Sequence, residues 1–325
     1  MSTKLLLTLV VLLAGEDLYG EQSDRAGGSA VRWLTVCATS CASNPFGITG
    51  RGTISGNAAT PQGERGFLLQ HDGAVTYVDT PGNILIELLK GNNSGEFVGS
   101  YFSPADSLVH AFVRDRNGLM RSFVYPGAAV TVAGGITDSG AVVGSYTADP
   151  TTAAGWVSFI EKSGTFPLTF QYPDPHASGT IALGINEKGS IVGVFTLTGS
   201  SALHAFERLR DGRFLEITFS GAQETYLSDI NESGVATGFW RDQSGVYHGL
   251  LYADGLCHSV DPPPSPSGYR NSTLNGINSA GQIVGVSFAK SPGDGDGFLM
   301  TFAPSGNQSG RAVSSPRIPC AAPRP

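Results

Sequence analysis

The chain has 325 residues, a formal net charge of −7 and only 14% charged residues. Lys and Arg form no runs, so the composition argues against binding to nucleic acid or to an anionic membrane surface. Glycine supplies 44 residues, roughly twice its usual share of about 7%, which indicates a chain with many tight turns.

The N-terminal segment has the features of a secretion signal. Lys4 precedes an apolar run from Leu5 to Ala14 that only Thr8 interrupts. This run is shorter than the roughly 20 residues of a membrane-spanning helix and suits the core of a signal peptide. We predict that residues 1–28 form a signal peptide and leader, that the chain has no membrane span, and that it is secreted, either extracellular or periplasmic.

A glycine-rich motif, GINEKGSIVG at residues 184–193, recurs along the chain. It lacks the lysine that a phosphate-binding loop needs after its second glycine, because Ser190 follows Gly189. We interpret it as a hairpin turn in which Asn or Thr tolerates a left-handed backbone and glycine avoids a clash. Six repeats begin near residues 47, 90, 135, 184, 229 and 276, with turn glycines at 52, 95, 140, 189, 234 and 281 and second glycines at 56, 99, 144, 193, 238 and 285.

Each repeat holds four short apolar segments separated by turns. In the fourth repeat they are TIALGI, SIVGVF, HAFERL and RFLEITF, within residues 180–219. Their length and their content of Val, Ile, Phe and Thr favour strands, which we name A to D. Four strands in 43 residues (47 to 90) to 49 residues (135 to 184) match one β-propeller blade, with a solenoid coil as the alternative.

The two ends of the repeat region decide between these arrangements. The sixth repeat supplies strands A to C but no D, whereas residues 31–36, VRWLTV, resemble a D strand without a blade of its own. Pairing the two would leave no bare sheet edge, and the polar caps of a solenoid are missing. We therefore predict an all-β, six-bladed β-propeller of four-stranded antiparallel blades over residues 29–304, closed by an N-terminal strand that completes the last blade. Residues 305–325 are predicted to be a flexible, Pro- and Ser-rich tail.

The repeats resemble those of the HAF-repeat proteins, a family of secreted bacterial origin. The pattern GINxxGxIVG followed by HAF is best matched at residues 184–206 and, in part, at 135–146, and the resemblance covers about residues 47–303. It implies an extracellular repeat protein and carries no assigned activity. Asp229 replaces the first Gly of the motif in the fifth repeat, a departure that does not threaten the fold.

Four cysteines, Cys37, Cys41, Cys257 and Cys320, suit an oxidising compartment and allow three pairings. The tail continues from the sixth blade, beside the N-terminal strand. We therefore expect a disulfide from Cys37 or Cys41 to Cys320, which would staple the ring shut.

Candidate site residues come from the repeats and from the variable loops. The first set occupies one blade position, either as a partial ring of ligands or, as we favour, as structural groups that hydrogen-bond the backbone of their own blade. The B-to-C and D-to-A connections vary in length and emerge on one face, which is where binding residues would concentrate. The first set is Arg65, His110, Trp156, His204 and His248, and the loop residues expected to contact a ligand near the axis are His176, Glu224, Tyr269 and Arg270.

No catalytic signature is present: GxSxG, HExxH and HxE are all absent. We predict a monomeric, non-catalytic binding or scaffolding module for a glycan or an extracellular protein, with no cofactor and no metal. The alternative is a glycan-active hydrolase or lyase whose residues assemble from several blades at the channel mouth.

Overall fold

The computed structural model describes residues 31–37, 41–80, 82–149, 155–289, 295–302 and 318–320. Across these residues the protein consists of strands and turns, without a helix. Accordingly, the described residues contain no helix long and apolar enough to cross a membrane. The predicted signal peptide and leader, residues 1–28, lie outside the described residues.

The strands follow the repeats, and consecutive strands within each repeat pair antiparallel. The first three units are β2 (Ser43–Ile48), β3 (Ile54–Thr60), β4 (Gly63–Leu69) and β5 (Val75–Val78); β6 (Ile84–Gly91), β7 (Phe97–Ser103), β8 (Leu108–Arg114) and β9 (Met120–Phe123); and β10 (Val130–Ile136), β11 (Val142–Thr147), β12 (Val157–Lys162) and β13 (Thr165–Phe170). The next are β14 (Ala177–Ile185), β15 (Ile191–Leu197), β16 (His204–Arg208) and β17 (Phe214–Ile217); β18 (Glu224–Ile230), β19 (Ala236–Arg241), β20 (Tyr247–Ala253) and β21 (Leu256–Ser259); and β22 (Asn271–Ile277), β23 (Gln282–Phe288) and β24 (Asp296–Thr301).

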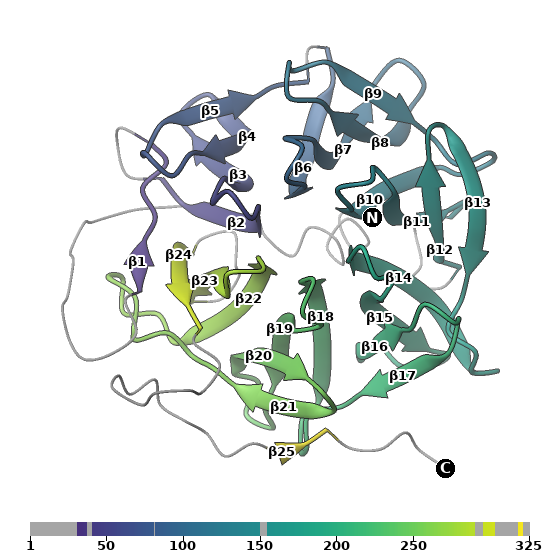
Figure 1. Ribbon diagram of the computed structural model, residues 1–325, viewed down its shortest axis with the longest axis vertical. Coiled ribbons are helices and arrows are strands. Elements are labelled where there is room, and N and C mark those ends of the chain that lie inside the picture. Colours follow the sequence, from purple (N-terminus) through teal and green to yellow (C-terminus); the bar gives the residue numbers. More distant parts are fainter. Residues whose placement is uncertain are drawn as a thin grey trace.

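These units lie around a common axis like the blades of a propeller, with β2, β6, β10, β14, β18 and β22 innermost (Figure 1). The last unit lies beside the first and contacts it. Asn278 Nδ2 donates to the Thr49 carbonyl at 2.9 Å, and Asn275 Nδ2 donates to the Pro45 carbonyl at 2.9 Å. The innermost strands therefore surround the axis and supply its lining.

A short N-terminal strand, β1 (Arg32–Trp33), pairs antiparallel with β24, opposing Trp33 to Phe298. Their rings meet edge to face with centroids 5.8 Å apart. Leu34 N–H extends the ladder by donating to the Gly297 carbonyl at 2.8 Å. The pairing between residues 31–36 and the sixth unit that the sequence predicted is thus present.

The second glycine of each motif is explained by close packing inside the blade. A Cβ built on Gly193 would lie 2.0 Å from the carbonyl oxygen of Ile181 in β14, next to an irregularity in the strand register. In five repeats this glycine also lies opposite a buried phenylalanine of strand C, as Gly56 lies opposite Phe67. The motif therefore keeps Gly where strand A and an aromatic ring approach strand B most closely.

The motif asparagine has a different role from the one predicted. The turn glycine, not the asparagine, has the positive φ, +83° at Gly189. Asn186 is buried; its Oδ1 accepts the Ser190 N–H at 3.1 Å, and its Nδ2 donates to the Asn231 carbonyl of the next unit at 3.0 Å. Asn231 bonds in the same way to the Asn278 carbonyl at 3.1 Å. These side-chain amides link neighbouring units, a contact that the sequence of one hairpin does not reveal.

The expected disulfide from Cys37 or Cys41 to Cys320 is wrong. Cys37 bonds to Cys41, and Cys257 bonds to Cys320. The reason is the path of the tail: β25 (Ile318–Pro319) pairs with β21 on the outside of the fifth unit and not with the sixth (Figure 1). Residues 318–320 of the predicted flexible tail are therefore held by a strand and a disulfide. The two disulfides indicate an oxidising extracellular or periplasmic environment.

Candidate functional site

The innermost strands enclose a cavity of about 150 Å³ on the axis. Its lining includes residues from the innermost strand of every unit, together with Leu203, Phe239, Tyr247 and Phe288. These four lie at or near the ends of strands that join the B-to-C connections. The cavity therefore lies toward the face that carries the variable loops.

A second cavity of about 80 Å³ lies at the other end of the axis, lined by the A-to-B turns. Lys90 lines both cavities. Its Nζ donates to the Phe46 carbonyl at 2.6 Å and to the Asn275 carbonyl, and lies 3.5 Å from Asp229 Oδ2. Lys90 therefore contributes to the walls of both cavities.

The Lys90 to Asp229 ion pair joins the two repeats that lack glycine at the first motif position. Gly47, Gly135, Gly184 and Gly276 occupy that position in the others. Both charged side chains are nearly buried, at 10% and 13% exposure. Burial lowers the pKa of Lys90 against the opposing effect of Asp229, and burial raises the pKa of Asp229 against the opposing effect of Lys90.

Glu87 is the most unusual group in the cavity lining. It lies on β6, is only 2% exposed, and its Oε1 has no hydrogen-bond partner. Burial, with a smaller contribution from the carboxylate of Glu64, raises the pKa of Glu87 well above its ordinary value. The raised pKa favours the protonated form of Glu87, and in that form the carboxyl can donate a hydrogen bond.

Two tyrosines, Tyr226 and Tyr247, line the same cavity as Glu87 and Glu224. Burial and then the charge of Glu87 raise the pKa of Tyr226, whose ring stacks on Phe239 with centroids 4.6 Å apart. Burial and then Glu224 raise the pKa of Tyr247. Both hydroxyls are thus neutral.

Glu224 is held by a bidentate ion pair. Its two carboxylate oxygens accept hydrogen bonds from Arg241, at 2.9 Å from Nη2 and 3.2 Å from Nε. The described lining of the cavity therefore contains a carboxyl with one unpartnered oxygen, Glu87 Oε1, and a second carboxyl, Glu224, that pairs with an arginine.

Of the four loop residues predicted to contact a ligand, the structure places Glu224 in the cavity lining. His176, Tyr269 and Arg270 do not belong to that lining, and His176 and Arg270 are exposed. Three further residues of the lining, Glu87, Lys90 and Tyr226, were not predicted. Two signals for this site were present in the sequence. One is the carboxylate of Glu87 within the apolar run ILIELLKG, and the other is the charge at the first motif position of two repeats, Lys90 and Asp229.

The residues at the repeated strand C position pair within their own blades. His110 lies 2.9 Å from Asp106, His204 3.3 Å from Glu216, and Arg65 2.6 Å from Asp79. The polar partners are carboxylates and not the backbone groups that we expected. Trp156 is not equivalent, because the strand register places Val157 opposite Tyr146, as His110 lies opposite Tyr101.

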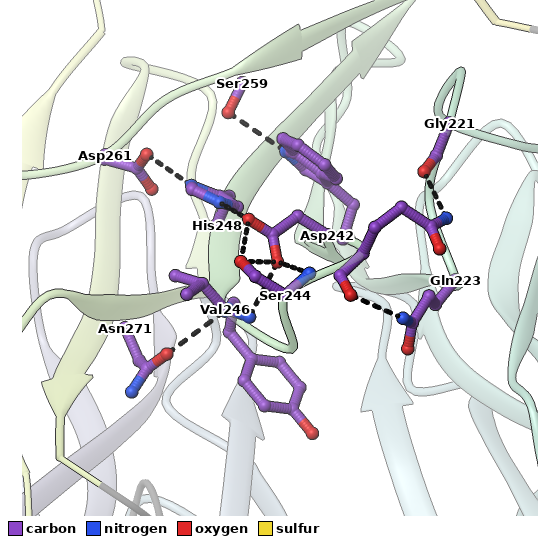
Figure 2. Close-up of polar contacts among 12 residues, drawn as sticks. Gly221, Gln223, Asp242, Ser244, Val246, His248, Ser259, Asp261 and Asn271 are labelled. Atoms are coloured by element: carbon purple, nitrogen blue, oxygen red, sulfur yellow. Dashed lines mark hydrogen bonds and ion pairs between the residues drawn. The ribbon is translucent and has the colours of Figure 1, made fainter.

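Both ring nitrogens of His248 have carboxylate partners (Figure 2). Its Nδ1 lies 2.8 Å from Asp261 Oδ2 and its Nε2 lies 3.4 Å from Asp242 Oδ2. Hydrogen bonds, foremost from the Ser244 side chain, lower the pKa of Asp242 to about 2. Asp261 also accepts hydrogen bonds from Gly249 N and Ser272 Oγ. This cluster ties the loops together and offers no free ring nitrogen to a ligand.

No protein-family model and no curated protein matches the chain. Among solved structures it is similar to a streptogramin B lyase, with 10% identity over 84% of this chain and 97% of that one and a TM-score of 0.45. A gluconolactonase of Xanthomonas campestris gives 14% identity over 84% and 89%, with a TM-score of 0.48. A variant of the Aleuria aurantia lectin in complex with Fucα1-6GlcNAc gives 12% identity over 87% and 97%, with a TM-score of 0.44. Scores this low carry no information about what the chain binds.

Proposed function

We propose that the chain is a secreted, monomeric, non-catalytic binding module of the HAF-repeat type, built as a closed six-bladed β-propeller, which takes its ligand into the axial cavity. The observation that carries this proposal is the cavity of about 150 Å³, formed jointly by the innermost strands and mainly apolar in its lining. Concave, mostly apolar sites with a few polar groups are typical of small-ligand binding. A glycan or protein ligand would therefore insert an apolar group.

Closure of the ring by β1 is the structural part of this proposal, and Leu34→Pro tests it. The variant removes the N–H that donates to the Gly297 carbonyl and should expose the edge of β24. We expect a loss of about 1–3 kcal/mol in the free energy of unfolding by urea denaturation, and self-association in size-exclusion chromatography. Leu34→Ala keeps the N–H and is the control. A monomeric Leu34→Pro variant with unchanged stability would refute closure by this strand.

Binding at the axis is tested with a cavity-filling variant. Leu183 lines the cavity, so Leu183→Trp should abolish retention of a ligand found by screening a glycan and protein panel. Leu119 is 74% exposed on the surface, and Leu119→Trp should retain the ligand as well as the unmodified protein does. Equal retention by both variants would show that the ligand binds elsewhere.

A glycan-active hydrolase or lyase is the second candidate, and the two carboxyls of the cavity favour it. Acid and base chemistry requires one neutral and one ionised group. Glu87 has a raised pKa, which favours its protonated form, and Glu224 forms an ion pair with Arg241. Release of products from the same panel, lost in Glu87→Gln, would establish this activity in place of simple binding.

A further inference from the structure

The chemistry of the axial cavity also indicates what kind of ligand it accepts, an inference that rests on the proposed function. Its walls are mostly hydrocarbon, including Leu89, Val132, Ile181, Phe239 and Phe288. A cavity of about 150 Å³ suits a compact molecule or a single ring. Transfer of apolar surface from water into such a site is favourable.

The charges of the cavity disfavour an anion. Among the described residues of its lining, Lys90 is the only cation, and two carbonyl groups and Asp229 already surround its Nζ. Arg241 does not belong to the lining, and it is engaged by Glu224. An anionic ligand would therefore enter an apolar site without a free positive partner, at a high desolvation cost.

The unmet hydrogen-bonding capacity is that of an acid. Glu87 is only 2% exposed, and its Oε1 lacks a partner. Buried polar groups are nearly always paired, so an unpaired one in a cavity lining calls for a partner. In its neutral form, the Glu87 carboxyl can donate its O–H to a ligand oxygen, and Tyr226 provides a second neutral O–H in the same lining.

We infer that the axial cavity binds a compact, neutral, largely apolar molecule that carries a carbonyl oxygen, and that this oxygen accepts a hydrogen bond from the Glu87 carboxyl. The protonated carboxyl of Glu87 supplies the donor and the ligand carbonyl supplies the acceptor, because a carbonyl oxygen accepts hydrogen bonds and cannot donate one. Once Glu87 ionises, its two acceptor oxygens repel the carbonyl oxygen. Affinity should therefore fall as pH rises through the pKa of Glu87.

The groups that act electrostatically on Glu87 come from several strands. Glu64 on β4 raises the pKa of Glu87 through its like charge, and Tyr226 on β18 is near enough for its own pKa to respond to Glu87. Lys90 and Glu224 also line the cavity. Glu64→Gln should therefore leave affinity at low pH unchanged and move the pH midpoint of binding downward.

Cyclohexanone serves as the probe, with methylenecyclohexane as the matched hydrocarbon and cyclohexanecarboxylate as the anion. We expect the ketone to bind at least tenfold more tightly than either, by ligand-observed NMR titration of the full chain. Glu87→Leu should lose about tenfold in ketone affinity. Glu87→Gln keeps an amide donor, so it should bind within about threefold of the unmodified protein at low pH and lose the pH dependence. Circular dichroism checks that each variant folds.

The outcomes separate this inference from the proposed function. Equal binding of ketone and hydrocarbon, tighter binding of the carboxylate, or an unchanged pH profile in Glu87→Gln would overturn the inference. In each of these cases, the proposed axial binding function would still hold if the Leu183→Trp variant failed to retain a ligand from the panel. If Leu183→Trp affects neither the probes nor any panel ligand, both proposals fail.

Discussion

Asp229→Gly should lower the free energy of unfolding by about 3–5 kcal/mol, the usual cost of leaving one member of a buried ion pair without its partner. The variant restores the glycine that four other repeats carry at this position, so backbone geometry is not the cause. Lys90, at 10% exposure, would keep two carbonyl acceptors but lose its counter-charge. Urea denaturation followed by tryptophan fluorescence measures the loss.

Adding Lys90→Gly to Asp229→Gly should recover most of this stability. The double variant removes both buried charges, and with them the cost of leaving Lys90 without a counter-charge. Arg213, whose side chain is 71% exposed and pairs with Asp211 at 2.8 Å, provides the surface control. Arg213→Ala should cost less than about 1 kcal/mol. If the double variant is as unstable as the sum of the two single variants, the residues are not coupled across the axis.

The sequence predicted the strands and their order because the signals for them are local. Glycine spacing, short β-branched segments and the incomplete sixth repeat each act over a few residues or one repeat. The antiparallel ladders and the pairing of Trp33 with Phe298 agree with these signals. Contacts between repeats lack such local signals, so the hydrogen bond from Asn186 to Asn231 was not predicted.

The site depended on geometry that the sequence does not contain. Lys90 and Asp229 are three repeats apart, and only the arrangement of the units around a common axis brings their side chains to 3.5 Å. The disulfide prediction failed for the same reason, because it assumed that the tail stays beside the sixth unit. The sequence shows that Glu87 is a charged residue inside an innermost strand. That its Oε1 lacks a hydrogen-bond partner follows only from the positions of the surrounding strands.

Gly238→Ala should also have a large effect, a loss of about 3 kcal/mol or more in the free energy of unfolding. Its Cβ would lie 1.8 Å from the carbonyl oxygen of Tyr226 and 2.9 Å from the Cα of Leu227, both backbone atoms of β18. Overpacking of a dense interior usually costs about 1–3 kcal/mol, and here no flexible side chain can move to relieve it. Strand β18 must shift away from β19, so thermal and urea denaturation should both detect the change.

Because Tyr226 lines the axial cavity, the same shift should also weaken ligand binding. Gly199→Ala is the control: Gly199 has φ +78°, and a Cβ there would meet nothing within 4 Å. That variant should cost only the strain of a left-handed residue, about 1–2 kcal/mol, and leave binding unchanged. Equal losses of stability in the two variants would show that β18 and β19 adjust freely, and the explanation of the second motif glycine by close packing would then be incorrect.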